Sequence, residues 1–367
     1  MTMKTVFPEV PAELRSRFLE PPTGRVRVVI DTDAANEIDD QFAIAWALQS
    51  PDRLEIEAVL AEPYSFRHLR DGLLEAAALI DGKQQTTEAE SALIDSYSSW
   101  VLGLREAGID PHRLEFVGPD EGMQLSYEEI LRVFERTGVA SEGKVFRGSD
   151  GYLPSVDEPL DSPAVDRLIE LAMAPGDDPL YVVAIGCVTN VASAILKAPE
   201  IIKKIVVLWT SGYPTWCPQS NAHSLNFVQD IPASRLLFDS GVPLVYFPGY
   251  YIGAQLRISL PEMERWVRGR GAIGDYLHHL YVDNPIYAQR GIRDHFGRTW
   301  VIWDMITLAW LIEPTWVPTT VIPTPTLDDD LCWSPRPGSQ WPMREAHGID
   351  RDAIFRDFFR RLERASR

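Results

Sequence analysis

Cysteine is scarce in this sequence, and the three that occur, Cys187, Cys217 and Cys332, are widely spaced and form no CxxC pair. A disulfide framework or a zinc site is therefore not expected, and a reducing cytoplasm is the expected compartment. Long apolar runs are also missing. No stretch reaches the roughly 18 residues that a spanning helix needs, and the N-terminal segment lacks an apolar signal region. We expect a soluble, unprocessed protein with no membrane partner.

Positive charge is in short supply, because 35 basic residues stand against 53 acidic ones and the formal net charge is -18. Such a surface repels phosphate backbones, so nucleic acid is not an expected partner. A neutral or cationic small molecule, or a metal ion, suits this field better. The hydrophobic fraction of 45% over 367 residues is typical of a globular protein with a sizeable core.

Short apolar runs alternate with amphipathic segments along the chain. Residues 25–32 (RVRVVIDT) and 54–61 predict strands, and residues 41–48 and 66–80 predict the helices that follow them. Further buried strands are predicted at residues 179–185, 204–209 and 243–247, and a final amphipathic helix at residues 350–366. This alternation indicates an α/β fold with a doubly wound, mostly parallel sheet.

The expected domain organisation is simple. Residues 1–24 carry four prolines and predict an N-terminal arm laid on the domain. Residues 25–367 form a single domain, within which the alternation weakens between about residues 83 and 162. That stretch predicts an inserted helical or lid region.

A carboxylate cluster follows the first predicted strand, with Asp31, Asp33, Glu37, Asp39 and Asp40 inside ten residues. Loops at the carboxyl ends of parallel strands converge on ligand sites, and so many carboxylates need a cation. Oxygen ligands without Cys or His favour calcium or magnesium, and calcium better tolerates ligands from separate loops. Two alternatives remain: Asp39 or Asp40 capping the next helix, or a haloacid dehalogenase phosphatase with Asp31 as its nucleophile.

Four motifs in this order carry a family resemblance: VVIDTDAANEIDDQFAIAWAL from residue 28, AIGCVTN at 184–190, SLNFVQDIPASRLLFDSGVPL at 224–244 and VIWDM at 301–305. The first resembles DxDPGxDD, with two extra residues and Ala-Ala in place of Pro-Gly. Together they resemble the inosine-uridine nucleoside hydrolases. The resemblance implies the nucleoside hydrolase fold, a calcium cofactor and assembly as a dimer or tetramer.

The resemblance also implies roles for individual residues. Calcium would be held by Asp33, Asp40, Asp304 and the main-chain carbonyl of Ile185, and Asp33 would also be the catalytic base. Asp39 and Asn226 would bind ribose hydroxyls, and Asp31 would support the cluster from behind.

Two positions depart from the family pattern. Ser224 stands where Glu is common, and Trp303 where His is common, so the usual proton donor to the leaving base is missing. Either aromatic stacking by Trp303, Trp209 or Trp216 holds the base, or a displaced histidine, His295 or His223, donates the proton. The loop GSDGYL at 148–153 is similar to a family loop near the sugar, with Arg147 where His is common, although a plain glycine turn explains it equally well.

The leading hypothesis is calcium-dependent hydrolysis of the N-ribosyl bond of a ribonucleoside or related N-riboside. A metal-containing protein that binds a nucleoside or ribose without catalysis is the main alternative. A magnesium-dependent phosphatase of the haloacid dehalogenase class is the other.

Overall fold

The computed structural model describes residues 5–82, 87–284, 287, 292, 294, 296–338 and 341–366. Its centre is an eight-stranded sheet in the order β3-β2-β1-β4-β5-β6-β12-β9, in which only β9 runs antiparallel to its neighbour. The strands of this sheet are β1 (Val26–Thr32), β2 (Leu54–Ala61), β3 (Val145–Phe146), β4 (Leu180–Ala184), β5 (Ile205–Ser211), β6 (Leu244–Pro248), β9 (Thr319–Pro323) and β12 (Pro342–Ala346). The predicted doubly wound, mostly parallel sheet is confirmed.

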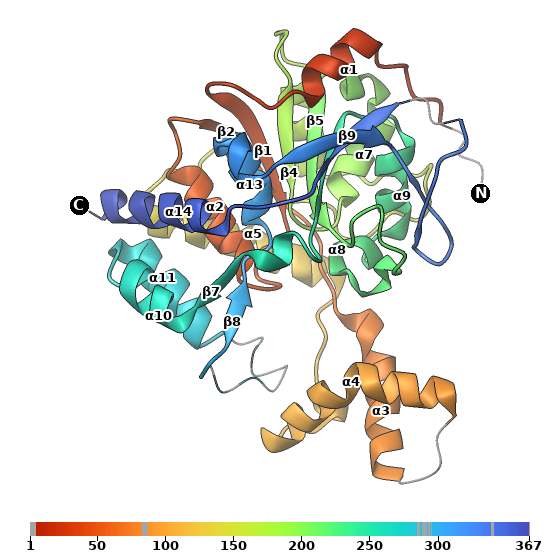
Figure 1. Ribbon diagram of the computed structural model, residues 1–367, viewed down its shortest axis with the longest axis vertical. Helices are drawn as coiled ribbons and strands as arrows, with labels where there is room; N and C mark the ends of the chain where they lie inside the picture. The colour runs from red at the N-terminus through yellow and green to blue at the C-terminus, as the bar shows by residue number, and fades with distance from the viewer. Residues whose placement is uncertain are drawn as a thin grey trace.

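Helices cover both faces of this sheet (Figure 1). One face carries α2 (Asp39–Leu48), α5 (Pro119–Thr137), α13 (Met305–Ile312) and α14 (Arg351–Ala365), and the other carries α6 (Pro163–Ala172), α7 (Thr189–Lys197) and α9 (Ile231–Asp239). The central strands are buried on both sides because their residues alternate between two cores. In β1, Val28 and Ile30 belong to the first core and Val29 to the second.

The remaining elements are short or peripheral. Two small antiparallel sheets pair β7 (Arg257–Ser259) with β8 (Thr299–Val301) and β10 (Thr326–Leu327) with β11 (Trp333–Ser334). The other helices are α1 (Ala12–Leu19), α3 (Arg70–Gly82), α4 (Glu88–Glu106), α8 (Leu225–Val228), α10 (Leu260–Glu262), α11 (Gly271–Val282) and the π-helix η6 (Met263–Val267). Short 3-10 turns are η1 (Arg67–Leu69), η2 (Pro111–Arg113), η3 (Pro199–Lys203), η4 (Asn221–His223), η5 (Gly253–Gln255) and η7 (Pro314–Trp316).

Helices α3 and α4 stand away from the sheet as a projection (Figure 1). They pack on each other through a small separate core of Leu73, Ala76, Ala77, Val101 and Leu104. Of the stretch predicted as an insertion, α4, η2 and the residues through Phe116 pack in this projection. Helix α5 packs on α2, and β3 extends the sheet beside β2.

The N-terminal segment lies on the domain through α1, whose Phe18 and Leu19 are buried in the first core. The Arg15 guanidinium, also buried, donates a hydrogen bond of 2.6 Å to the carbonyl of Gly241. Within the described ranges, every helix is too short or too polar to cross a bilayer.

The strand order changes direction between β1 and β4, which are hydrogen-bonded neighbours although two strands separate them in the chain. In doubly wound sheets a crevice opens at such a point, beyond the carboxyl ends of the strands. Thr32 ends β1 and Ala184 ends β4 there, so the loops that follow them are placed to form a binding site.

Candidate active site

A cavity of 820 Å³ lies beyond the carboxyl ends of β1, β4 and β5. It is lined by eight of the residues expected at the site: Asp33, Asp39, Asp40, Ile185, Ser224, Asn226, Trp303 and Asp304. They come from four separate segments of the chain. Asp31 and Trp209, the other two expected residues, do not line it.

The loop after β1 turns sharply to bring Asp33 into the cavity. Ala35 adopts φ 80°, a left-handed conformation that glycine tolerates far better than alanine. The amide of Asn36 donates to the carbonyl of Asp33 at 3.2 Å, and the Tyr64 hydroxyl donates to the carbonyl of Ala35 at 3.3 Å. A strained residue held by its surroundings at a turn is common next to functional groups.

Asp39 and Asp40 occupy the first turn of α2 and are fully buried. Neither acts as the cap, because the N-cap position belongs to Ile38 and no side-chain capping hydrogen bond forms there. The Thr32 hydroxyl donates to Asp40. Simple capping therefore does not explain this pair, although the helix N-terminus still favours their negative charge.

Asp304 reaches the site from β8, which pairs with β7 and ends just before it. The backbone amide of Ile302 donates to the carbonyl of Leu256 at 2.8 Å, so the chain enters the cavity directly from the paired strands. Asp304 then begins α13, where it occupies the N-cap position without a side-chain capping hydrogen bond.

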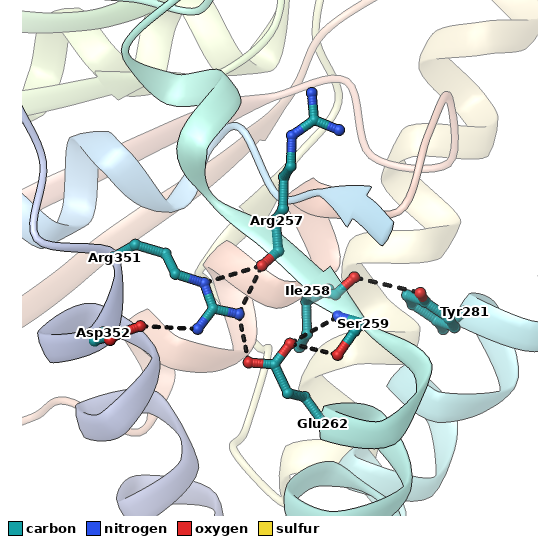
Figure 2. Close-up of polar contacts among 7 residues, drawn as sticks. All are labelled: Arg257, Ile258, Ser259, Glu262, Tyr281, Arg351 and Asp352. Atoms are coloured by element: carbon teal, nitrogen blue, oxygen red, sulfur yellow. Dashed lines mark hydrogen bonds and ion pairs between the residues drawn. The ribbon is translucent and has the colours of Figure 1, made fainter. Parts of the chain in front are cut away.

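Figure 2 shows how β7, the partner of β8, is anchored to α14. The Arg351 guanidinium donates twice to the carbonyl of Arg257, at 3.0 and 2.7 Å, and pairs with Glu262. From the other side, the Tyr281 hydroxyl donates to the carbonyl of Ile258 at 3.3 Å. The C-terminal helix thus holds β7, the strand paired with β8, and β8 leads to Asp304.

Asp39, Asp40 and Asp304 form a group of carboxylates whose oxygens lie within 4.8 Å of one another, all buried. Across the described part of the chain, no Lys, Arg or His side chain pairs with any of them. Burial, and then the neighbouring carboxylates, raise the pKa of each well above the ordinary value. An uncompensated acidic group of this kind fits a hard divalent cation.

Asp33 lies next to this group and is held by two amides. The side chain of Asn36 donates to its Oδ2 at 2.6 Å and that of Gln229 at 3.3 Å, while Oδ1 is buried with no partner. Burial, with a smaller contribution from the charge of Asp39, raises the pKa of Asp33 to about 8. Gly186 lets the carboxylate approach, since a Cβ there would lie 2.9 Å from the Asp33 Cγ.

The tightest carboxylate group thus differs from the one that the family resemblance implies. The implied metal ligands were Asp33, Asp40 and Asp304, whereas the structure gathers Asp39 with the last two. The carbonyl of Ile185, the implied fourth ligand, accepts a hydrogen bond from the Asn226 side chain at 3.2 Å. A carbonyl has a second lone pair, so this contact leaves one acceptor site open.

A polar layer lies beneath the cavity. Asp31 faces Glu62 and accepts a hydrogen bond from the Asn190 side chain at 3.0 Å, and Glu62 accepts one from the Asn190 amide at 2.8 Å. Burial raises the pKa of Asp31 to about 6 and that of Glu62 well above the ordinary value. The two carboxyl groups are close enough to share a proton. Asp31 therefore sits behind the cluster.

Ser224 and Asn226 line the cavity from the start of α8. The Ser224 hydroxyl lies 2.8 Å from that of Ser211 and accepts a hydrogen bond from the Gly212 amide at 2.9 Å. The Asn226 side chain also donates to the carbonyl of Thr210 at 3.1 Å. Both side chains are thus held by the end of β5.

The three tryptophans proposed for base stacking have different positions. Trp303 is half-buried and lines the cavity. Trp209 is fully buried, its ring lies 4.6 Å from that of Phe227, and its indole donates to the carbonyl of Gly186 at 3.0 Å. The expectation that Trp209 contacts the substrate is corrected here, because its ring belongs to the core. Trp216 lies outside the cavity and is 69% exposed.

The histidines are at the rim. His223 is exposed and lines the cavity, and His295 lies outside the described residues. His68, in η1, also lines the cavity and was not expected. Nothing in the local sequence pattern marks it, since only the position of the projection brings it near the site.

The projection supplies an outer wall, whose individual residues were not predicted although they lie in the stretch predicted as an inserted helical or lid region. Tyr97, Trp100 and Phe116 line the cavity there, with the rings of Trp100 and Phe116 6.2 Å apart. Gln229 was also missed, although it lies in the quoted 224–244 segment. A single glutamine has no distinctive spacing in the sequence, so only the contact of its side chain with Asp33 shows that it belongs to the site.

The GSDGYL loop serves the layer beneath the site. The Ser149 amide donates to the Asn190 side chain at 3.0 Å, and the Tyr152 hydroxyl donates to Gln229 at 2.9 Å. Arg147 lies over the ring of Tyr127 at 3.9 Å and donates to Gln124. Neither the loop nor Arg147 lines the cavity, so its place near a sugar is corrected to a supporting position.

Comparison with known proteins decides the family. The model of the inosine-uridine preferring nucleoside hydrolases matches residues 104–347, more than half of the chain. The chain belongs to this family. The resemblance to this family is thereby confirmed, and three of its four motifs lie within the matched range. The 31–40 carboxylate cluster lies before the matched range of this nucleoside hydrolase family.

Curated members of the family are similar over part of their length. The pyrimidine-specific ribonucleoside hydrolase RihA of Enterobacter sp. (strain 638) is 28% identical over 179 residues, which are 46% of this chain and 53% of RihA. RihA of Escherichia coli (strain SMS-3-5 / SECEC) is 27% identical over the same length and shares. The chain spans about half the length of the curated relatives it matches.

Solved structures support the nucleoside hydrolase fold over nearly the whole chain. A purine-preferring ribonucleoside hydrolase from Gardnerella vaginalis has a TM-score of 0.60 at 20% identity, covering 93% of this chain and 99% of its own. An inosine-guanosine nucleoside hydrolase has a TM-score of 0.61 at 16% identity, covering 92% and 99%. At these identities the likeness concerns the fold alone.

Proposed function

We propose that this protein is a calcium-dependent hydrolase that cleaves the N-ribosyl bond of a ribonucleoside or related N-riboside, releasing ribose and base. The observation that carries the proposal is the buried group of Asp39, Asp40 and Asp304, beside the unpartnered oxygen of Asp33, at the base of a cavity. Family membership supports the reaction class, and the curated relatives are named as ribonucleoside hydrolases.

The donor set fits a calcium ion. Asp33, Asp40, Asp304 and the carbonyl of Ile185 would hold it, with Asp39 near enough to be a further ligand. All donors are hard oxygens from separate loops, which suits the six to eight flexible ligands of calcium. When bound, the ion supplies the positive charge that lowers the pKa of a neighbouring water molecule.

Asp33 would act as the base. Its Oδ2 is fixed by Asn36 and Gln229, so Oδ1 is the atom left to accept a proton from water. A fixed base at a fixed distance from the sugar lowers the entropic part of the barrier. Asp39 and Asn226 would hold ribose hydroxyls.

Cleavage of a ribosyl C–N bond develops positive charge on the sugar, as in other oxocarbenium-like reactions. The carboxylates around the cavity base stabilise that charge. Trp303 cannot donate a proton to the leaving group, since an indole N–H is not an acid at neutral pH. The proton would then come from solvent or from a rim histidine such as His223, while the Trp303 ring holds the base.

The phosphatase alternative is not supported, because its nucleophile, Asp31, faces Glu62 and Asn190 behind the cavity. Ser224 and Trp303 give specific support to the alternative of binding without catalysis. Neither side chain can donate a proton to the leaving group as the residues common at these positions in the family would. Calorimetry separates it: tight nucleoside binding without turnover over hours would favour that alternative.

The deciding experiment incubates the full chain with a panel of purine, pyrimidine and modified nucleosides and assays released ribose, with calcium and with a chelator. Chelator-sensitive release is expected for at least one nucleoside. Asp33→Asn should reduce it by about a thousandfold, as loss of a general base typically does. The exposed Asp178→Asn serves as the matched control and should leave the rate unchanged. If no nucleoside is cleaved, the enzymatic proposal fails.

We also propose assembly as a homodimer or homotetramer and a cytoplasmic location, as the family resemblance and the cysteine content suggest. Light scattering of the purified chain tests the first, and a single monomer mass would contradict it.

A further inference from the structure

Five aromatic rings form a continuous series that starts in the cavity. The ring centroids of Trp303 and Tyr250 are 6.0 Å apart, those of Tyr250 and Tyr213 4.4 Å, those of Tyr213 and Tyr251 5.7 Å, and those of Tyr251 and Trp216 6.0 Å. The last pair is nearly parallel, at 9°. We call Trp303, Tyr250, Tyr213, Tyr251 and Trp216 the aromatic track.

The aromatic track runs from the cavity into solvent. Trp303 and Tyr250 line the cavity, next to Asp304. At the other end Tyr251 is 49% exposed and Trp216 69% exposed. Two stacked rings with this much exposure leave apolar area in contact with water, so they do not stabilise the free protein as core residues would.

The backbone beneath the aromatic track is firmly held. The carbonyl of Tyr213 accepts hydrogen bonds from the Tyr246 hydroxyl and the Trp333 indole, each at 2.9 Å. Thr215 donates from its amide and its hydroxyl to the Glu345 carboxylate, both at 2.7 Å. The exposed rings therefore sit on a rigid base, which is the arrangement expected of a preorganised binding surface.

Tyr251 adds backbone strain. Its φ is 69°, in the left-handed region where a large side chain is unfavourable. The Gln255 side chain donates to the carbonyl of Tyr251 at 2.9 Å and helps to hold this conformation. Strain of this kind persists where the surroundings impose it, most often at ligand sites. Here it accompanies an exposed ring that lies against both Tyr213 and Trp216.

From this geometry we propose that the aromatic track binds a second planar ring attached to the leaving group of the substrate. The inference rests on the proposed N-ribosyl hydrolysis, since Trp303 must lie beside the base. Aromatic faces stack on flat rings of many kinds, whereas the acidic residues of the cavity repel phosphate. The substrate class is thus an N-riboside whose base carries an aryl substituent.

The test compares each parent nucleoside with its aryl derivative: adenosine with N6-(2-phenylethyl)adenosine, and cytidine with N4-benzoylcytidine. Affinities are measured by calorimetry on the unmodified full chain in the presence of a chelator, so that turnover does not interfere. At least one aryl derivative should bind about tenfold more tightly than its parent, the gain of one added aromatic contact.

Two variants remove the outer end of the aromatic track. Trp216→Ala and Tyr251→Asn should each abolish most of the tenfold gain and leave the affinity for the parent nucleosides within twofold. Asn is chosen because it tolerates the left-handed conformation at residue 251. The control is Trp266→Ala, which removes another exposed tryptophan, stacked on Phe359 of α14, and should leave the gain intact.

The proposal and the proposed function fail separately. A gain in affinity that depends on Trp216, without ribose release by the unmodified chain, would contradict the hydrolase only. Ribose release from a parent nucleoside, with no gain for either aryl derivative, would overturn the aromatic track as a ligand site. The same conclusion follows if Trp216→Ala dissociates an oligomer in sedimentation, because the rings would then form a subunit contact.

Discussion

The base of the cavity and its outer wall are built in different ways. The base consists of buried carboxylates that follow β1 or lie at the N-terminal ends of α2 and α13. Asn36, Gln229 and Thr32 hold their side chains. The outer wall consists of half-exposed rings from the projection, from Trp303 and from Tyr250 in the loop after β6. In the proposed function, the half that would hold the ion and the sugar is buried and polar, and the half that would meet the leaving group is aromatic and partly exposed.

This difference matches the chemistry that the proposed function assigns to each half. Ion binding and proton transfer need fixed oxygen positions, so the base draws on strand ends and helix starts packed against two cores. Recognition of a leaving group tolerates variation, and loops on a rigid scaffold can change without cost to the fold. We expect changes in substrate preference to map to the outer wall.

The largest effect should come from breaking the base at Asp304. Asp304→Asn removes one carboxylate from the buried group, and the loss of cation binding should lower ribose release by about a thousandfold. Calcium should raise the melting temperature of the unmodified protein and not that of the variant. Differential scanning fluorimetry with and without calcium measures this. Equal calcium shifts in both proteins would contradict the placement of the ion.

The pH dependence of stability tests the same group without metal. Burial raises the folded pKa of Asp304 above its ordinary value of 3.8 and that of Asp33 to about 8. Such a carboxyl contributes its stability at low pH and loses it as the pH rises through the raised folded value. From about pH 4 to pH 8 the chelated wild type should therefore lose stability relative to Asp304→Asn. Urea unfolding at both pH values checks the sign, and a wild type that gains on the variant would refute it.

A smaller effect is expected on the outer wall. Trp303→Ala should raise KM for a cleaved nucleoside by about tenfold through lost stacking, with a lesser change in kcat. Trp303→Phe keeps a ring and should recover most of the loss. A fall in kcat alone, at constant KM, would instead assign Trp303 to the chemical step and weaken the contrast between the two halves.

The smallest effect should be at the strained turn beneath Asp33. Ala35→Gly relieves the left-handed conformation at φ 80° and should stabilise the protein by up to about 1 kcal/mol. Ala92→Gly, in the exposed face of α4, is the matched control and should destabilise by about the same amount. Denaturant midpoints give both values. Destabilisation by Ala35→Gly would show that the turn is not strained.

The strands show where prediction from the sequence works well. The run at residues 54–61 coincides with β2, and that at 25–32 differs from β1 by one residue. Buried parallel strands are continuous apolar runs, so their signal is local. The N-terminal arm was not predicted to contain a helix, yet α1 forms because Phe18 and Leu19 find a place in the core.

The candidate site shows where such prediction stops. Acidic motifs at residues 31–40 and 301–305 marked Asp33, Asp39, Asp40 and Asp304, and all four line one cavity. Trp209 was proposed as a ring that stacks on the base, but it lies within β5 and its side chain is buried in the core. Gln229 and His68 had no local signal.

The sequence alone predicts a parallel α/β sheet and an acidic turn after the first strand, and it contains the motifs of the family. These follow from short-range patterns of apolar and acidic side chains, which act within a few residues. The tertiary structure alone decides that Asp39 joins Asp40 and Asp304, that Asp31 lies behind them and that five rings line up toward solvent. Those arrangements depend on contacts between segments that are far apart in the chain, and local sequence patterns do not determine how close such segments come.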